Sequence, residues 1–139
     1  MRLTRRYRFS ASHRLNSPRL SDEENRALYG KCNNPYGHGH NYTLDVSVRG
    51  PLDAAGRVAD VRELDRLVGG QVLAALDHRN LNAEVAAFAS VVPTTENIAV
   101  HVKTLLERSW KEAFPAPGPV LDRIRIEETD NNFFELPSL

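Results

Sequence analysis

Polar and apolar residues alternate along the start of the chain, which predicts a half-buried strand ending at His13. Most positions of one parity are apolar, and the other parity carries Thr, Arg and Ser. A second alternating stretch runs from residue 38 to residue 49, where Gly50-Pro51 ends it. The apolar positions of the two stretches are Leu3, Tyr7, Phe9, Ala11, Tyr42, Leu44, Val46 and Val48.

Two later segments carry apolar residues at helical spacing. The first follows Asp60, which suits an N-cap, and runs to Leu76. Gly69-Gly70 lies inside it and costs about 2 kcal/mol relative to two alanines if the pair is helical. The second begins at Thr94 or Thr95, and prolines between residues 115 and 119 end it.

Two short strands, residues 124–129 and 133–136, are predicted to follow, joined by a turn at residues 130–132. The element order ββααββ indicates an α+β fold, a four-stranded antiparallel sheet with two helices on one face. Residues 16–36 are expected to form a long loop with one helical turn at residues 21–24. We expect residues 1–139 to form one domain, and its two sheet edges favour oligomerisation into a closed β-barrel.

Composition narrows the function classes. The 139 residues carry no net charge, which argues against nucleic acid and membrane surfaces as partners. A single cysteine excludes an intramolecular disulfide and suits a reducing compartment. The first residues do not resemble a signal peptide, and no apolar run approaches a membrane span, so we expect a cytoplasmic protein.

The strongest chemical signal is His38-Gly39-His40. Histidines at positions i and i+2 of a strand project from the same face. If the first two strands are antiparallel neighbours, His13 joins this pair, and three imidazoles can bind Zn²⁺ with a fourth position open. Cys32 precedes His38 by six residues in a polar setting and is a candidate reactive thiol. The structural alternatives are a polar strand-end His13 and a buried inert Cys32.

Three further groups carry weaker signals. Asp77-His78 pairs a carboxylate with an imidazole that can carry protons, although histidine also favours helix ends. Glu127 and Glu128 end a strand on opposite faces; one can bind the N–H edge of a heterocycle, while an exposed charge is the ordinary alternative. Thr94-Thr95-Glu96-Asn97 is typical of a helix N-terminus.

Taken together, these segments resemble the 6-pyruvoyl-tetrahydropterin synthase family. The matching strings, in family order, are FSASHRL (9–15), SDEEN (21–25), GKCNNPYGHGHNY (30–42), LDHRNLN (76–82), TTEN (94–97) and ETDNN (128–132). The resemblance implies a tunnelling fold, in which trimers close a twelve-stranded barrel and two trimers stack into a homohexamer. It also implies active sites between subunits.

The resemblance further implies roles for individual residues. His13, His38 and His40 correspond to zinc ligands, and Cys32 to the general base. The remaining implied roles are proton relay for Asp77 and His78, and pterin binding for Glu128 with Thr94 and Thr95 beside it. The implied reaction converts 7,8-dihydroneopterin triphosphate to 6-pyruvoyl-tetrahydropterin with elimination of triphosphate. From charge alone, candidate triphosphate contacts are Arg14, Lys31 and Arg79.

Two alternatives stay open. The related 6-carboxytetrahydropterin synthases use the same zinc site and substrate but release acetaldehyde, and their cysteine typically lies closer to the His-Gly-His motif. Five residues separate Cys32 from His38 here, which favours the 6-pyruvoyl branch. The other alternative is a non-catalytic zinc- or pterin-binding protein. A Cys32→Ala variant that keeps zinc but loses turnover would separate the enzyme from such a binder.

Overall fold

The computed structural model describes residues 1–138 and leaves Leu139, the last position of the expected domain, outside the described residues. Its centre is one five-stranded sheet with the strand order β3-β1-β2-β4-β5. The strands pair antiparallel except β1 and β3, which run parallel. The strand bounds are β1 Arg2–His13, β2 His38–Arg49, β3 Arg79–Asn80, β4 Val120–Thr129 and β5 Asn132–Pro137.

The α+β class is confirmed, but the expected four-strand count is wrong. The additional strand is β3, which comes from the polar segment after the first long helix and pairs only with Ala11 and Ser12. Two residues are too few to show a period, so the sequence pattern could not reveal it. Strand β4 also begins four residues earlier than expected, at Val120, because Leu121 is buried and pairs with Val48.

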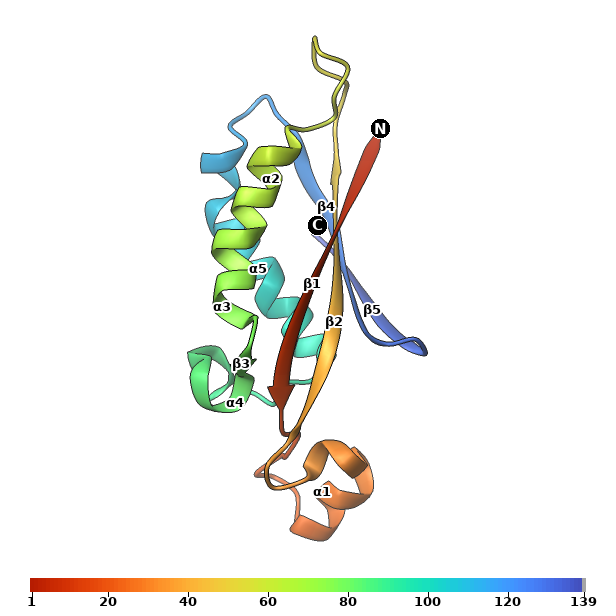
Figure 1. Cartoon of the computed structure of the whole chain (residues 1–139), viewed down its shortest axis with the longest axis vertical. Coiled ribbons are helices and arrows are strands. Elements are labelled where there is room, and N and C mark those ends of the chain that lie inside the picture. The colour runs from red at the N-terminus through yellow and green to blue at the C-terminus, as the bar shows by residue number, and fades with distance from the viewer. Residues whose placement is uncertain (139) are drawn as a thin grey trace.

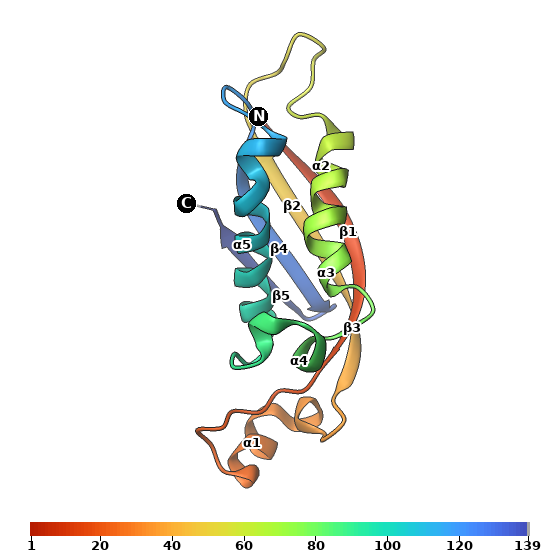
Figure 2. The ribbon, with the colours of Figure 1, turned by 90° about the vertical axis from the view of Figure 1, so that its left-hand side faces the viewer.

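Both long helices cover the same face of the sheet, as the sequence predicts (Figures 1 and 2). The first is continuous and consists of α2 (Val61–Val68), a π-helical turn (Gly69–Leu73) and α3 (Ala74–Leu76). The second is α5 (Thr95–Ala113). Asp60 caps the first helix with a side-chain oxygen, as predicted, and Thr94, one of the two predicted candidates, caps the second, so both helices start at defined positions.

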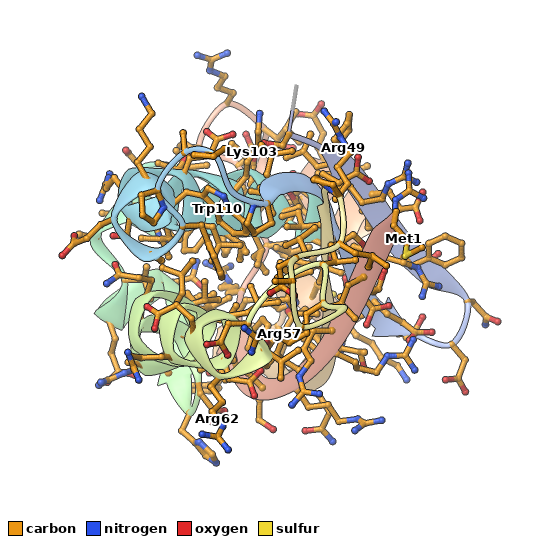
Figure 3. All side chains as sticks on the ribbon, turned by 90° about the horizontal axis from the view of Figure 1, so that it is seen from above. Met1, Arg49, Arg57, Arg62, Lys103 and Trp110 are labelled. Carbon is orange, nitrogen blue, oxygen red and sulfur yellow. The ribbon has the colours of Figure 1, made fainter. Side chains whose placement is uncertain are left out.

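The core fills the space between the helices and the sheet (Figure 3). Alternate residues of β2 and β4 supply its sheet side, and the inner positions of α2 and α5 supply the other. Each fully buried large aliphatic side chain contributes about 1.5–3 kcal/mol relative to an exposed one. The side chains with the least exposure include Tyr42, Leu44, Leu64, Leu76, Ile98, Leu106, Ile124 and Ile126.

The opposite face of the sheet is polar and rich in arginine. Arg6 donates two hydrogen bonds to Asp45, and Arg125 donates a third to the same carboxylate. Asp122 forms ion pairs with Arg2 and other arginines near the end of the sheet. These contacts fix β1, β2 and β4 to one another on the side away from the helices.

The segment between β1 and β2 forms a small lobe at the end of the sheet, at the bottom of Figure 1. It contains α1 (Asp22–Tyr29), twice the single turn expected, and the 3-10 turn Gly30–Asn33. The Ser21–Glu24 capping box is confirmed. The remaining elements are α4 (Leu81–Glu84) and the 3-10 turn Ala86–Phe88. None of the described helices combines the length and the apolar character needed to cross a membrane.

Candidate metal centre and active site

The register of β1 and β2 brings three histidines together at the lobe end of the sheet. His13 lies opposite His38, and His40 follows on the same face two residues along β2. This is the face that carries the core, and the three imidazole rings contact one another with centroids 4.3–5.6 Å apart. The antiparallel pairing expected from the sequence therefore gives the expected convergence.

Cys32 completes the cluster from the 3-10 turn. Its Sγ lies 2.9 Å from Nε2 of His38. The ligand atoms of His13, Cys32, His38 and His40 all lie within 4.8 Å of one another, so one ion could contact the whole set.

His13 is oriented by the main chain. Its Nδ1 lies 2.9 Å from the carbonyl oxygen of Pro93, which can only accept, so Nδ1 carries the hydrogen and Nε2 carries the lone pair. Among residues 1–138, the buried Nε2 of His13 has no hydrogen-bond partner, and the buried Nε2 of His40 faces only a carboxylate oxygen of Glu128, 3.0 Å away but not oriented as a hydrogen bond. Buried nitrogens without well-oriented partners are costly, and a divalent cation would satisfy both. The imidazole and thiol donors therefore fit Zn²⁺.

The turn that carries Cys32 is fixed to the chain just after His13. Its main-chain carbonyl accepts a hydrogen bond from the N–H of Leu15 at 2.7 Å. The buried Asn33 side chain donates to the carbonyl of Leu15 and to the side chain of Asn16. Gly37 adopts φ 69°, and a Cβ there would overlap the carbonyl oxygen of His13. These contacts place the thiol beside the histidines.

Burial controls the protonation of the cluster. It lowers the pKa values of His13 and His40, so both rings favour the neutral form that binds a metal. Burial also raises the pKa of the Cys32 thiol, and the negative charge of Glu128 raises it further. Without a nearby cation, Cys32 is therefore a protonated thiol at neutral pH.

Glu128 lies next to the cluster, where the pairing of β4 and β5 is irregular between Glu127 and Thr129. Its Oε1 is 3.0 Å from Nε2 of His40. The buried Thr95 hydroxyl donates a hydrogen bond to its other oxygen. Thr94 caps α5 by accepting from the main-chain N–H of Asn97. The start of α5 thereby orients the carboxylate beside the histidines.

Asp77 and His78 lie elsewhere, at the outer edge of β1. The Asp77 carboxylate accepts a hydrogen bond from the main-chain N–H of Ser10 and lies 3.1 Å from Nδ1 of His78. The His78 side chain is 82% exposed. Within residues 1–138, no hydrogen bond or ion pair joins either side chain to the histidine–cysteine cluster. One chain therefore does not assemble the whole set of residues singled out in the sequence.

The three cationic candidates are dispersed. Arg14 donates to the main-chain carbonyl of Asn33, Lys31 is exposed, and Arg79 lies 3.8 Å from a carboxylate oxygen of Glu84. The sequence did not predict Pro93 as a site residue. Its main-chain carbonyl accepts the hydrogen bond from His13, and no side-chain pattern reveals such a contact. Sequence reasoning also missed Tyr42, whose hydroxyl lies 3.4 Å from Nδ1 of His13, although the strand parity places both on one face.

Two sizeable hollows lie away from the cluster. One, of about 700 Å³, lies between the loop after β2 and the proline-rich segment after α5. Another, of about 740 Å³, lies beside α3 and α5. Neither contains a histidine of the cluster, so cavity size alone would point to the wrong part of the molecule.

Comparisons with known proteins agree with the geometry. A family model described as 6-pyruvoyl tetrahydropterin synthase matches residues 2–138. A 6-pyruvoyl tetrahydrobiopterin synthase of Poecilia reticulata is 50% identical over 131 residues, which cover 94% of this chain and 85% of that protein. The Homo sapiens protein of the same name is 47% identical over 131 residues, which cover 94% of this chain and 86% of that protein. The solved Caenorhabditis elegans 6-pyruvoyl tetrahydropterin synthase has a TM-score of 0.87 at 41% identity, covering 99% of this chain and 94% of that one.

Proposed function

Because this chain belongs to the 6-pyruvoyl tetrahydropterin synthase family, we propose that it is a zinc-dependent lyase acting on 7,8-dihydroneopterin triphosphate. The products are 6-pyruvoyl-tetrahydropterin and inorganic triphosphate. The observation that carries the proposal is the convergence of three imidazoles and one thiol within 4.8 Å, beside an oriented carboxylate. The oxidation is internal to the substrate side chain, so no external redox cofactor is required.

His13, His38 and His40 are the proposed zinc ligands. When bound, the ion would acidify hydroxyl groups of the substrate side chain and favour the thiolate form of Cys32. The neutral state of the buried His13 and His40 supports this assignment, because only a neutral imidazole can donate its lone pair.

Cys32 is the proposed general base. Its thiolate takes a proton from a side-chain carbon of the substrate, and triphosphate leaves with the electron pair of the C–O bond that breaks. His78, oriented by Asp77, transfers protons between carbon and oxygen in the later hydrogen shifts. Because no hydrogen bond or ion pair within residues 1–138 joins Asp77 or His78 to Cys32, we propose that a second subunit supplies them to each site.

Glu128 is the proposed pterin anchor. A carboxylate accepts two parallel hydrogen bonds from the guanidine-like edge of a pterin ring. Thr95 donates to one of its oxygens and thereby holds the orientation, while Thr94 begins the helix that positions Thr95.

We further propose that residues 1–139 form one domain, that three copies close a β-barrel, and that two such trimers form a homohexamer. Strand β5 pairs only with β4 in the described chain, and most of β1 pairs only with β2, which supports pairing between copies. The single cysteine supports a reducing compartment, the cytoplasm.

The proposal is tested by product analysis with purified, zinc-loaded protein and 7,8-dihydroneopterin triphosphate. We expect release of triphosphate without acetaldehyde. Stoichiometric acetaldehyde would instead assign the chain to the 6-carboxytetrahydropterin branch. If neither product formed from protein that holds zinc, a non-catalytic zinc- or pterin-binding role would replace both enzymatic ones.

A Cys32→Ala variant tests the proposed base. We expect it to retain zinc while turnover falls by about 100-fold or more, which is the usual range for loss of a general base. Loss of zinc in this variant would identify Cys32 as a required ligand and refute its assignment as a free base.

A further inference from the structure

The side chain of Asn82 holds the main chain of Arg14, the residue that follows His13. Its carbonyl oxygen accepts a hydrogen bond from the N–H of Arg14 at 2.7 Å, and its amide nitrogen donates one to the carbonyl of Arg14 at 2.9 Å. A residue of a neighbouring antiparallel strand makes the same two bonds in a hydrogen-bonded pair. Because β1 ends at His13, the Asn82 side chain acts as a partner strand one residue beyond that end.

The position of Asn82 is itself fixed by the segment around it. The residue lies in α4, beside the end of β1 (Figures 1 and 2). Leu81 is fully buried in the core, and the Asn80 side chain caps α4 by accepting from the N–H of Ala83. Strand β3, directly before α4, pairs with β1. Asn82 therefore holds Arg14 from a rigid support.

The stretch that Asn82 holds adjoins two parts of the proposed zinc centre. On one side it follows the ligand His13 directly. On the other side, the N–H of Leu15 donates to the carbonyl of Cys32 at 2.7 Å, and the Arg14 side chain donates to the carbonyl of Asn33 at 3.2 Å. Movement of Arg14 would therefore displace both the His13 ring and the turn that carries the thiol.

Stability of α4 does not explain an asparagine at this position. Asn82 is the second residue of α4, where asparagine forms a helix less readily than alanine. Both side-chain hydrogen bonds of Asn82 in residues 1–138 go to Arg14 rather than to α4. A carboxamide suits this contact, because it combines an acceptor and a donor, whereas a carboxylate only accepts.

We propose that Asn82 is a positioning residue of the metal centre. Through the main chain of Arg14 it holds His13 and the turn of Cys32 in place. This inference rests on the proposed function and extends it. It gives one segment two roles: His78 acts in the site of another subunit, while Asn82, four residues later, orders the zinc centre of its own chain.

Zinc affinity, measured against a competing chelator, tests the proposal without turnover. We expect Asn82→Ala to weaken zinc binding about tenfold, the low end of the range for groups that orient metal ligands. Asn82→Asp keeps an acceptor for the N–H of Arg14 but lacks the donor, so its affinity should lie between the two. The control is Asn80→Ala, which removes the cap of α4 but no contact with Arg14. It should bind zinc like the unmodified protein.

These measurements also separate the proposal from a general effect on folding. If Asn82 only served the stability of α4, alanine would bind zinc at least as well as asparagine, because it is the better helix former. Unchanged zinc affinity in Asn82→Ala would overturn the proposal, as would an equal loss in Asn80→Ala. Circular dichroism checks that each variant is folded.

Subunit mixing then shows which site Asn82 serves. If turnover of zinc-loaded Asn82→Ala falls about tenfold, refolding it with an equal amount of His78→Ala should restore about a quarter of the full activity. A site can then combine an intact zinc centre from one chain with an intact His78 from the other. Refolding with Cys32→Ala should leave only about a twentieth, because every site with an intact Cys32 lacks its own Asn82.

The mixtures distinguish failure of this proposal from failure of the proposed function. Recovery of a quarter of the activity with Cys32→Ala, and not with His78→Ala, would assign Asn82 to the site of His78 and overturn the proposal. Weakened zinc binding in Asn82→Ala, in a protein whose unmodified form does not turn over the substrate, would refute only the proposed function.

Discussion

At the scale of the residue, one main-chain carbonyl determines how His13 enters the metal centre. The carbonyl of Pro93 fixes the hydrogen on Nδ1, so Nε2 faces the other imidazoles with its lone pair before any ion binds. The sequence places His13 at a strand end, but it cannot show the chain segment that comes to lie behind the ring.

Replacing His13 with alanine should weaken zinc binding by at least about 100-fold, since even the loss of a group that only orients a ligand costs 10- to 100-fold. His101→Ala is the matched control, because this half-buried histidine of α5 packs against Phe88 and lies outside the cluster. Zinc content after dialysis against a competing chelator measures both variants. Equal zinc loss in the two would contradict the assignment of His13 as a ligand.

Asp45 should make folding stability depend on pH in the acidic range. Hydrogen bonds from Arg6 hold the pKa of its carboxyl below the usual value, despite burial. A lowered folded-state pKa stabilises the fold above the unfolded-state pKa, and this contribution disappears as the pH falls through the folded-state value. We therefore expect Asp45→Asn to cost about 1–2 kcal/mol at pH 6, and this cost to shrink as the pH falls below the ordinary carboxyl pKa toward the lower folded-state value.

Urea unfolding of both proteins at equal concentration and at each pH measures the difference. A cost that does not decrease anywhere between about pH 6 and pH 2 would show that packing of the Asp45 side chain, rather than its charge, is what matters.

At the scale of the element, sequence reasoning succeeded where a period was long enough to detect. The twelve-residue strands β1 and β2 and the helix α5 follow from alternation, helical spacing and caps. The strand β3 and the second turn of α1 could not be predicted from such patterns, because each depends on contacts made by neighbouring segments. The site divides in the same way: the histidine cluster follows from strand parity, whereas the contact of Glu128 with His40 requires the packed structure.

The two glycines inside the first long helix lie at the start of its π-helical turn. A Cβ at Gly70 would meet no atom within 4 Å, and the position is exposed. Gly70→Ala should therefore raise stability by about 0.5–1 kcal/mol, because alanine loses less backbone entropy on folding.

The contrasting variant is Gly37→Ala, which combines a positive φ with overlap onto His13 and should be clearly destabilising. Thermal unfolding of the two variants and the unmodified chain measures both effects. A lower melting temperature for Gly70→Ala would mean that the π-helical turn requires glycine.

At the scale of the whole molecule, the separation of Asp77 and His78 from the histidine–cysteine cluster makes the proposed sharing of sites between subunits testable. Cys32→Ala and His78→Ala variants should each be nearly inactive alone. If every site takes Cys32 from one subunit and His78 from another, equal mixing of subunits restores about a quarter of the sites, one half times one half.

The two variants are unfolded, mixed and refolded together, and turnover is compared with that of each variant refolded alone. Native mass spectrometry checks that assemblies containing both variants have formed. No recovered activity in such assemblies would show that each site draws Cys32 and His78 from the same chain.

The sheet edges also determine when the chain is most prone to aggregation. In the described part of one chain, β5 and most of β1 each present an edge without a second partner strand. A newly folded single copy therefore offers two templates for strand addition, and in the proposed assembly pairing between copies competes kinetically with aggregation at these edges. If the copies pair in this way, strong dilution prolongs the exposed interval, and the yield of native protein depends on how quickly the copies meet.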